Sequence, residues 1–244
     1  MALHKLKRIA HLPKPPKHGY SVLLVTLLML MVLGPVGRQF GLGDFTNTIL
    51  ISMVLISGLY AVSSRKGMLT VVILTGLAAF MVHWLIFVTT WDRLALFGAE
   101  ITGMLFFGLI GVMLLQDILS RRGNVSWSLI HGALSVYLIM GIVFAFAYSF
   151  LYTITPDAFT GADKLDGPGF HNFIYLSYVT LTTLGFGDIT PTRPIASSLV
   201  TLEAVVGQIY LTVLVARLVG MHITAEVAEL DDADEQETLD EPDK

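Results

Sequence analysis

A short run of residues combines glycines, threonines, an aromatic residue and an acid in an order that can bind a cation through backbone atoms. Residues 182–188 read Thr-Thr-Leu-Gly-Phe-Gly-Asp. The alternating glycines, Gly185 and Gly187, let the backbone adopt positive φ at little steric cost, so successive carbonyl groups can turn to one side. We expect this row of oxygens to replace the water around a dehydrated cation, with the Thr183 hydroxyl at its inner end.

The elements that must position this run begin with an apolar stretch that is too short to cross a membrane. As a helix, residues 170–183 would rise about 21 Å, which is less than the ~30 Å hydrocarbon core. We therefore expect a re-entrant segment buried in protein, because bare backbone in lipid leaves polar groups unpaired. The C-terminal end of its helix carries about half a negative charge and favours a cation.

The composition of the whole chain excludes a water-soluble fold. The 244 residues are 54% hydrophobic and 14% charged, whereas soluble domains carry about 25% charged residues. Since about 20 apolar residues suffice to cross a bilayer, we predict six membrane-spanning helices. Their ranges are 20–36, 45–63, 68–90, 94–116, 129–152 and 195–219.

The positions of lysine and arginine predict the orientation of these helices. Nine of them lie in the N-terminal arm and in the second and fourth loops, and four lie in the alternate loops. The positive-inside rule then places both termini in the cytoplasm, and residues 153–194 outside a cell membrane. A signal peptide is the alternative for the first span, but the basic arm is long and no small-residue cleavage site follows Val36.

The sequence Thr-Leu-Gly-Phe-Gly-Asp at 183–188 resembles the selectivity-filter signature of potassium channels, Thr-Val-Gly-Tyr-Gly-Asp. Phenylalanine at the aromatic position also occurs in that family, for example in two-pore-domain potassium channels. The resemblance extends over residues 129–220 and implies an outer helix, a pore helix, a filter and an inner helix. A ring of filter carbonyls takes four loops and this chain supplies one, which implies a homotetramer.

The resemblance implies an all-α membrane protein that conducts potassium passively and is not an enzyme. A weakly selective monovalent cation channel on the same scaffold is the alternative. An intramembrane hydrolase would need a paired nucleophile and base, which the few membrane histidines do not supply, and no cofactor is expected besides the permeant ion. Nucleic-acid binding has no support, because the basic residues are scattered at helix ends, and the absence of cysteine excludes disulfides and thiolate metal sites.

The resemblance implies a role for each filter residue and for several of its neighbours. The ion sites are formed by Thr183, Leu184, Gly185 and Phe186, followed by Gly187, and the supporting residues are Thr182, Asp188, Tyr175 and Glu203. Many family members have a tryptophan pair where this chain has Tyr175 and Leu176, so bracing of Asp188 would fall to Tyr175 or another donor.

The inner helix contributes further candidates. Glu203 is expected to accept hydrogen bonds from pore-helix hydroxyls such as Thr180 or Thr182, or else to add negative potential to the cavity. Gly207 is either a hinge or a close packing position. Gln208 and Thr212, spaced i, i+4, either line the cavity or bond between helices.

The first four helices cannot sense voltage in the usual way. A voltage sensor needs several arginines in the field, and residues 94–116 contain no lysine or arginine. His83 and Glu100 lie at equal distances from the outer turn between their helices. We therefore expect them to pair, either as a structural contact or as a proton sensor, since histidine titrates near neutral pH.

We divide the chain into four parts. A basic arm covers 1–19, a four-helix transmembrane domain 20–122, a pore domain 123–220 and an acidic tail 221–244. The basic residues of the arm set the topology or bind anionic lipid. We expect the tail to be disordered, because it has few large apolar residues and many acids.

Overall fold

The computed structural model describes residues 16, 18–41, 43–64, 66–88, 93–121, 125–162 and 169–240, with the backbone alone near several helix ends. The elements are almost all helical, which confirms the expected all-α class. They are α2 (Gly19–Gln39), α3 (Gly43–Val62), α4 (Lys66–Val88), α5 (Arg93–Ser120), α6 (Trp127–Ile154), the 3-10 turn η1 (Pro156–Ala158), β1 (Phe159–Thr160), α7 (Phe170–Leu181), β2 (Thr190–Pro191) and α8 (Pro194–Asp240).

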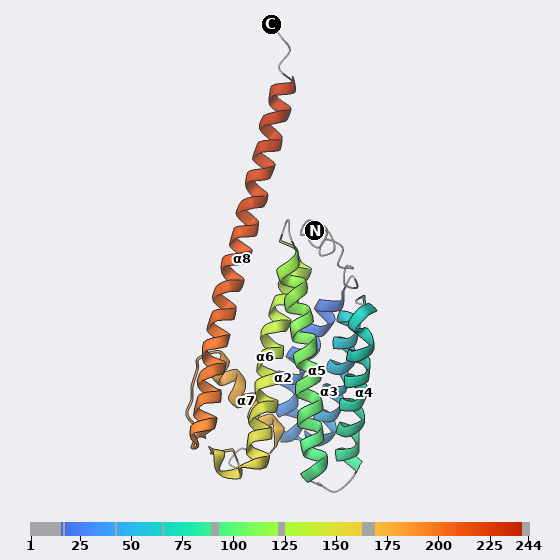
Figure 1. Cartoon of the computed structure of the whole chain (residues 1–244), viewed down its shortest axis with the longest axis vertical. Helices are drawn as coiled ribbons and strands as arrows, with labels where there is room; N and C mark the ends of the chain where they lie inside the picture. Colours follow the sequence, from blue (N-terminus) through green and yellow to red (C-terminus); the bar gives the residue numbers. More distant parts are fainter. Residues whose placement is uncertain are drawn as a thin grey trace, which may run out of the picture.

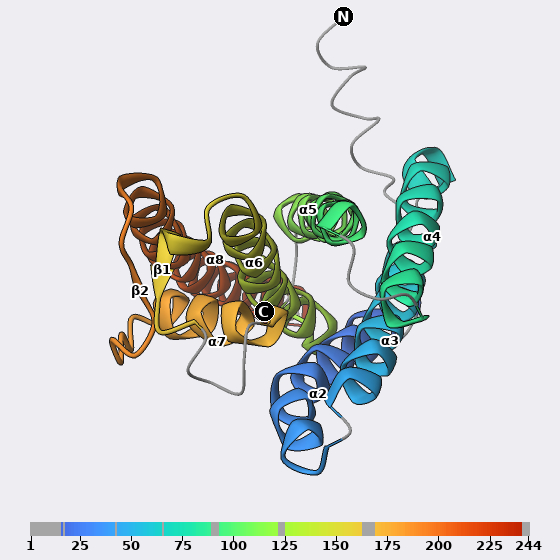
Figure 2. The ribbon, with the colours of Figure 1, turned by 90° about the horizontal axis from the view of Figure 1, so that it is seen from below.

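The long helices pack side by side with α6 at the centre (Figure 1). Helix α6 contacts α2 and α5 on one side and α7 and α8 on the other, while α3 and α4 complete the four-helix region. Viewed along the bundle, α4 lies at one edge, and α8 with the strand β2 lies toward the opposite edge (Figure 2). Helix α6 is therefore shared by the four-helix region and the C-terminal part.

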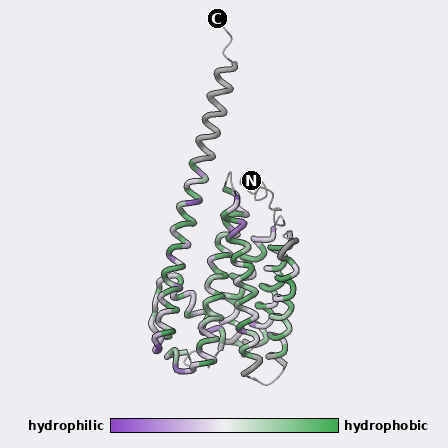
Figure 3. Tube along the Cα trace, in the orientation of Figure 1, coloured by the Kyte–Doolittle hydropathy of each residue, from purple (hydrophilic) through white to green (hydrophobic). Residues whose placement is uncertain are grey.

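Five helices in the described part of the chain are long and apolar enough to cross a membrane. The qualifying segments are Gly19–Gly37, Phe45–Val62, Leu96–Ser120, Trp127–Ile154 and Pro194–Ile223. The sixth predicted span is the helix α4, which is apolar over Leu69–Leu85, where its side chains are described. Apolar residues run along most of the coloured length of these helices (Figure 3).

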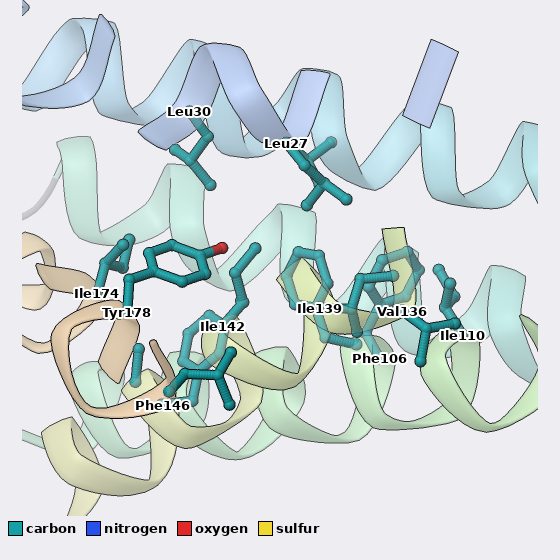
Figure 4. Close-up of a cluster of buried hydrophobic side chains, with 14 of the residues drawn as sticks. Leu27, Leu30, Phe106, Ile110, Val136, Ile139, Ile142, Phe146, Ile174 and Tyr178 are labelled. Carbon is teal, nitrogen blue, oxygen red and sulfur yellow. The ribbon is translucent and has the colours of Figure 1, made fainter. Parts of the chain in front are cut away.

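The buried core lies where α6 meets its neighbours. Figure 4 shows Leu27 and Leu30 of α2 facing Ile139 and Ile142 of α6, with side chains of α5 and α7 around them. A glycine of α6 also allows α7 to approach closely. A Cβ on Gly141 would lie 2.4 Å from the ring of Tyr178, so the small residue brings α7 against α6, as is common between membrane helices.

The acidic tail differs from the prediction. Instead of becoming disordered at residue 221, the backbone continues α8 to Asp240. Helix-forming Ala, Glu, Gln and Leu dominate this part of the sequence, and it contains no glycine or proline between Gly220 and Pro242. As a helix, the 47 residues of α8 extend about 70 Å, and Figure 1 shows α8 projecting well beyond the other helices.

The far end of α5 is fastened to α8 by one arginine. The Nη2 atom of Arg217 lies 3.0, 2.8 and 2.7 Å from the carbonyl oxygens of Ile118, Leu119 and Arg121. Ile118 and Leu119 lie in the last turn of α5 and Arg121 directly follows it, where carbonyls lack the amide four residues farther along a helix. Arg217 thus caps α5 and ties the four-helix region to the last helix.

A buried acid beside this contact joins α5 to α2. Asp117 Oδ2 accepts hydrogen bonds from the Tyr20 hydroxyl at 2.5 Å and from Arg121 Nε at 2.8 Å. Our sequence reading did not single out Asp117, because it follows the predicted span directly and looks like an ordinary helix-end charge.

We predict that Arg217→Ala lowers the free energy of unfolding by about 1.5–3 kcal/mol, the range for hydrogen bonds to charged groups, because the α5 carbonyls lose their cap. Arg217→Lys should retain part of this stabilisation, because lysine can still donate to the α5 carbonyls. The measurement is equilibrium unfolding in detergent followed by circular dichroism. Arg193→Ala is the matched control, since Arg193 makes an exposed ion pair with Asp157 that contributes little. Equal losses for the two alanine variants would contradict the prediction.

Candidate functional site

Helix α7 has the short length expected of a re-entrant segment. It contains 12 residues, begins after Gly169 and packs against α6 and α8. The end of α6 and the start of α8 lie at the same end of the bundle (Figure 1), so the chain enters through α7 and returns on one side. Seven of its first ten residues are buried, as backbone at membrane depth requires.

All four carbonyl groups at the C-terminal end of α7 have partners. The Tyr178 oxygen accepts from the Thr182 amide at 3.0 Å, and the Thr180 oxygen accepts from the Thr183 amide at 2.9 Å. The Val179 oxygen accepts from the amides of the next two residues at 2.9 and 3.3 Å. The Leu181 oxygen accepts from the Tyr137 hydroxyl of α6 at 3.0 Å. The start of the following loop is thereby fixed to the helix end.

The loop after α7 has the alternating backbone that the sequence predicts. Its φ angles are 60° at Thr183, 57° at Gly185 and 76° at Gly187, so every second residue from 183 is left-handed. Glycine takes this conformation freely, whereas a threonine with positive φ is an outlier that indicates strain at a functional site. Sequence reasoning predicted the glycine positions but did not anticipate the left-handed Thr183.

The carbonyls of this loop remain free, although its first amides are bonded. Within the described part of the chain, no hydrogen bond is donated to the carbonyl oxygens of residues 183–186. The side chains of Leu184 and Phe186 are 58% and 64% exposed. A row of unpaired oxygens on a left-handed alternation can coordinate a dehydrated monovalent cation, which needs oxygen ligands in place of its water.

Asp188, at the outer end of the loop, is held from two directions. The Tyr175 hydroxyl of α7 donates to Asp188 Oδ2 at 2.6 Å, which is the bracing contact expected where tryptophan is absent. The Ile189 amide donates to Asp188 Oδ1 at 3.0 Å. Both carboxylate oxygens are therefore used to fix the end of the loop.

Glu203 of α8 is fully buried behind α7, with partners different from those predicted. Its carboxylate accepts hydrogen bonds from the Ser177 hydroxyl of α7 and the Tyr148 hydroxyl of α6. The predicted partners Thr180 and Thr182 were wrong: the Thr182 hydroxyl instead donates to the Tyr178 carbonyl at 2.6 Å. The face of α7 toward α8 carries Ser177, and the acid joins three helices at one point, away from solvent.

Three tyrosines that the sequence reading missed connect α6 to the site. The Tyr178 hydroxyl of α7 donates to the Leu138 carbonyl at 2.9 Å, and the Tyr210 hydroxyl of α8 donates to the Ala133 carbonyl at 2.6 Å. Tyr137 stacks on Tyr210 with ring centroids 6.1 Å apart. The available signal was the clustering of tyrosines in otherwise apolar spans, since a buried tyrosine hydroxyl usually has a partner.

The remaining inner-helix candidates fall into two groups. A Cβ on Gly207 would lie 2.7 Å from Leu181 Cδ1 and 3.3 Å from the Leu181 carbonyl oxygen, which favours the packing interpretation over a hinge. Gln208 and Thr212 are exposed, and the Thr212 hydroxyl donates to the Gln208 carbonyl of the same helix at 2.8 Å. Within one chain they therefore do not join two helices.

The predicted pairing of His83 with Glu100 was wrong. Glu100 Oε1 accepts hydrogen bonds from the hydroxyls of Ser149 and Thr153 on α6, at 2.6 and 2.9 Å. Among the described residues, His83 Nε2 and Glu100 Oε2 have no hydrogen-bond partner. Equal distance from a turn fixes the depth of two residues but not their rotation about the helix axes, and Glu100 faces α6. The proton-sensor interpretation depended on a contact between His83 and Glu100, which the described part of the structure does not contain.

Two comparisons with known proteins find a similarity, and the family match lies in the C-terminal part of the chain. Residues 133–223 match a family model described as an ion channel. Kirbac3.1, an inward rectifier potassium channel of Paramagnetospirillum magnetotacticum, is 33% identical over 98 residues, which are 40% of this chain and 30% of that protein. The chain thus matches less than a third of the length of this relative. No solved structure matches the chain. The family match confirms the resemblance that the loop sequence indicates.

We predict that Glu203→Ala lowers the free energy of unfolding by about 1–3 kcal/mol, the cost of leaving a buried donor unpaired, because Tyr148 loses its acceptor. Glu203→Gln keeps an acceptor oxygen at the same place and should cost clearly less. Equilibrium unfolding of the full chain in detergent measures both, with Tyr148→Phe as the control that removes the donor. Equal losses for the alanine and glutamine variants would contradict a role based on hydrogen bonding.

Proposed function

We propose, from the premise that residues 133–223 belong to the ion-channel family, that this membrane protein is a potassium-selective channel. Ions pass through without energy input, and adjacent ions repel one another along the row of oxygens. The ion sites are the carbonyls of Thr183, Leu184, Gly185 and Phe186, together with the Thr183 hydroxyl. Kirbac3.1, which is similar over 98 residues, is named as a potassium channel.

One observation carries this proposal: the asymmetry between amides and carbonyls in the loop. The amides of residues 183–185 are bonded to carbonyls of α7, while the carbonyls of 183–186 accept no hydrogen bond from the described chain. Unpaired backbone carbonyls at membrane depth are costly unless they face water or a cation. A potassium ion that has lost its hydration shell supplies the missing positive charge.

We further propose that four copies assemble around the ion path. A ring of carbonyls around one ion takes four loops, and the chain has one. Of the apolar span of α8, 17% is buried in the single chain, against 56% for α6. Among the five spans compared in this way, the helix next to the filter is thus the least covered, which fits a position facing other subunits and the cavity. Gln208 and Thr212 then lie on α8 where they can line that cavity.

The proposed orientation has the filter outside and the two termini in the cytoplasm. The positive-inside rule supports it, and an even number of spans agrees with it. The channel does not gate by charges on α5, because residues 94–116 carry no lysine or arginine to respond to the field.

We predict that the purified protein in liposomes gives a potassium flux that barium blocks and that Gly185→Ala abolishes. Gly185 has φ +57° with no atom near its Cβ position, so alanine disturbs the carbonyl direction without a clash. Gly41→Ala is the matched control, since Gly41 has φ +73° and equally open surroundings outside the filter. The readout is flux through a potassium-sensitive dye.

Two outcomes would overturn parts of the proposal. The absence of flux in the wild type, or equal flux for Gly185→Ala and Gly41→Ala, would exclude conduction through this loop. A reversal potential near zero in opposed potassium and sodium solutions would replace selectivity for potassium by a weakly selective cation channel.

A further inference from the structure

The chain leaving the filter runs antiparallel to the chain leaving α6. Strand pairing places Thr160 opposite Thr190 and Phe159 opposite Pro191. The register continues outward, because the Thr192 amide donates to the Ala158 carbonyl at 2.9 Å. At the outer end, the Thr192 hydroxyl donates to the Asp157 carbonyl. We call the paired segments 157–161 and 188–193 the outer strand pair.

The inner end of the outer strand pair touches the filter itself. Gly161 has φ +85°, and a Cβ there would lie 1.9 Å from the carbonyl oxygen of Asp188 and 3.3 Å from Ile189 Cα. No side chain fits this contact without moving the backbone of Asp188. Asp188 is the last residue of the filter sequence, so Gly161 sets how closely the outer segment can approach the filter exit.

The segment 157–161, which makes the contact at Gly161, is itself packed against the helices α6 and α7. Ala158 and Phe159 are buried, and the ring of Phe159 packs edge-on against Tyr148 of α6 and against Phe173 of α7, at centroid distances of 5.5 and 5.7 Å. Beyond Gly161, the Ala162 carbonyl accepts from Asn172 Nδ2 at 2.6 Å. The outer segment is thus attached to the two helices that precede the filter.

The outer end of the strand pair carries an ion pair between Asp157 and Arg193. The hydrogen bond from Arg193 lowers the pKa of the Asp157 carboxyl, so the carboxylate stays charged at neutral pH. Both side chains are more than half exposed, and such pairs contribute little. The contact at Gly161, and not the ion pair, is therefore the main constraint.

We propose that Gly161 is a positioning residue for the filter and that the outer strand pair holds the Asp188 end of the filter in its conducting shape. This inference rests on the proposed function. The hydrogen bonds to α7 fix the inner end of the filter, and the outer strand pair fixes its exit. The carbonyls between these two ends then have a defined spacing, which coordination of a dehydrated ion requires.

The test compares Gly161→Ala with Gly41→Ala in the 244-residue chain in liposomes. Both replacements put alanine at positive φ, but only the first forces a side chain against a backbone oxygen. We expect a several-fold fall in the potassium-to-sodium permeability ratio for Gly161→Ala and no change for Gly41→Ala. Amide hydrogen exchange at residues 185–189 should also speed up in Gly161→Ala alone.

The outcomes separate this inference from the proposed function. Hydrogen exchange reports the contact at Gly161 even if the wild type conducts no ions. A wild type without conduction would refute the proposed function only. Equal exchange and equal selectivity in the two alanine variants would overturn the role of Gly161. If Gly161→Ala does not assemble, Thr192→Pro decides, since proline removes the amide of this exposed residue that donates to the Ala158 carbonyl. Wild-type exchange and selectivity in Thr192→Pro would refute the role of the outer strand pair.

Discussion

The constraint on which the structure depends is that backbone polar groups at membrane depth must be satisfied without water. Helix α7 ends inside the protein, where its last four carbonyls have no partner farther along the helix. The loop amides of residues 182–185 and the Tyr137 hydroxyl satisfy these four carbonyls. Because these amides are used in this way, the backbone of residues 183–185 has only its carbonyls left to offer, and carbonyl oxygens are ligands for a cation.

The same constraint explains why α6 is central. A re-entrant helix needs neighbours that cover it. Helix α6 provides a close surface at Gly141, a hydroxyl donor in Tyr137, and acceptors in the carbonyls of Leu138 and Gly141. The opposite face of α6 packs against α2 and α5. The four-helix region therefore buttresses the helix on which the loop depends, and Arg217 adds a second connection at the far end of α5.

Much of the fold could be predicted from the sequence, because length and apolarity determine membrane helices almost directly. The spans, the short re-entrant helix and the alternating glycines all follow from rules that involve one segment at a time. Composition alone predicted disorder for the acidic tail, but residues 224–240 continue helix α8. An acidic sequence can be polar and still be a good helix former. The left-handed Thr183 was not predictable, because threonine rarely adopts positive φ. Here its φ of 60° accompanies the turn that brings the amides of Leu184 and Gly185 to the Val179 carbonyl.

Partners of buried acids were the least predictable feature, and the reason is general. Sequence reasoning sought opposite charge, and so paired Glu100 with His83, whereas Glu100 is bonded to Ser149 and Thr153. Glu203 is likewise bonded to hydroxyls, of Ser177 and Tyr148. A hydroxyl can satisfy an acid without bringing a second charge out of water, whose cost often cancels the attraction. Serine, threonine and tyrosine are frequent in membrane helices, so only packing decides which one meets the acid.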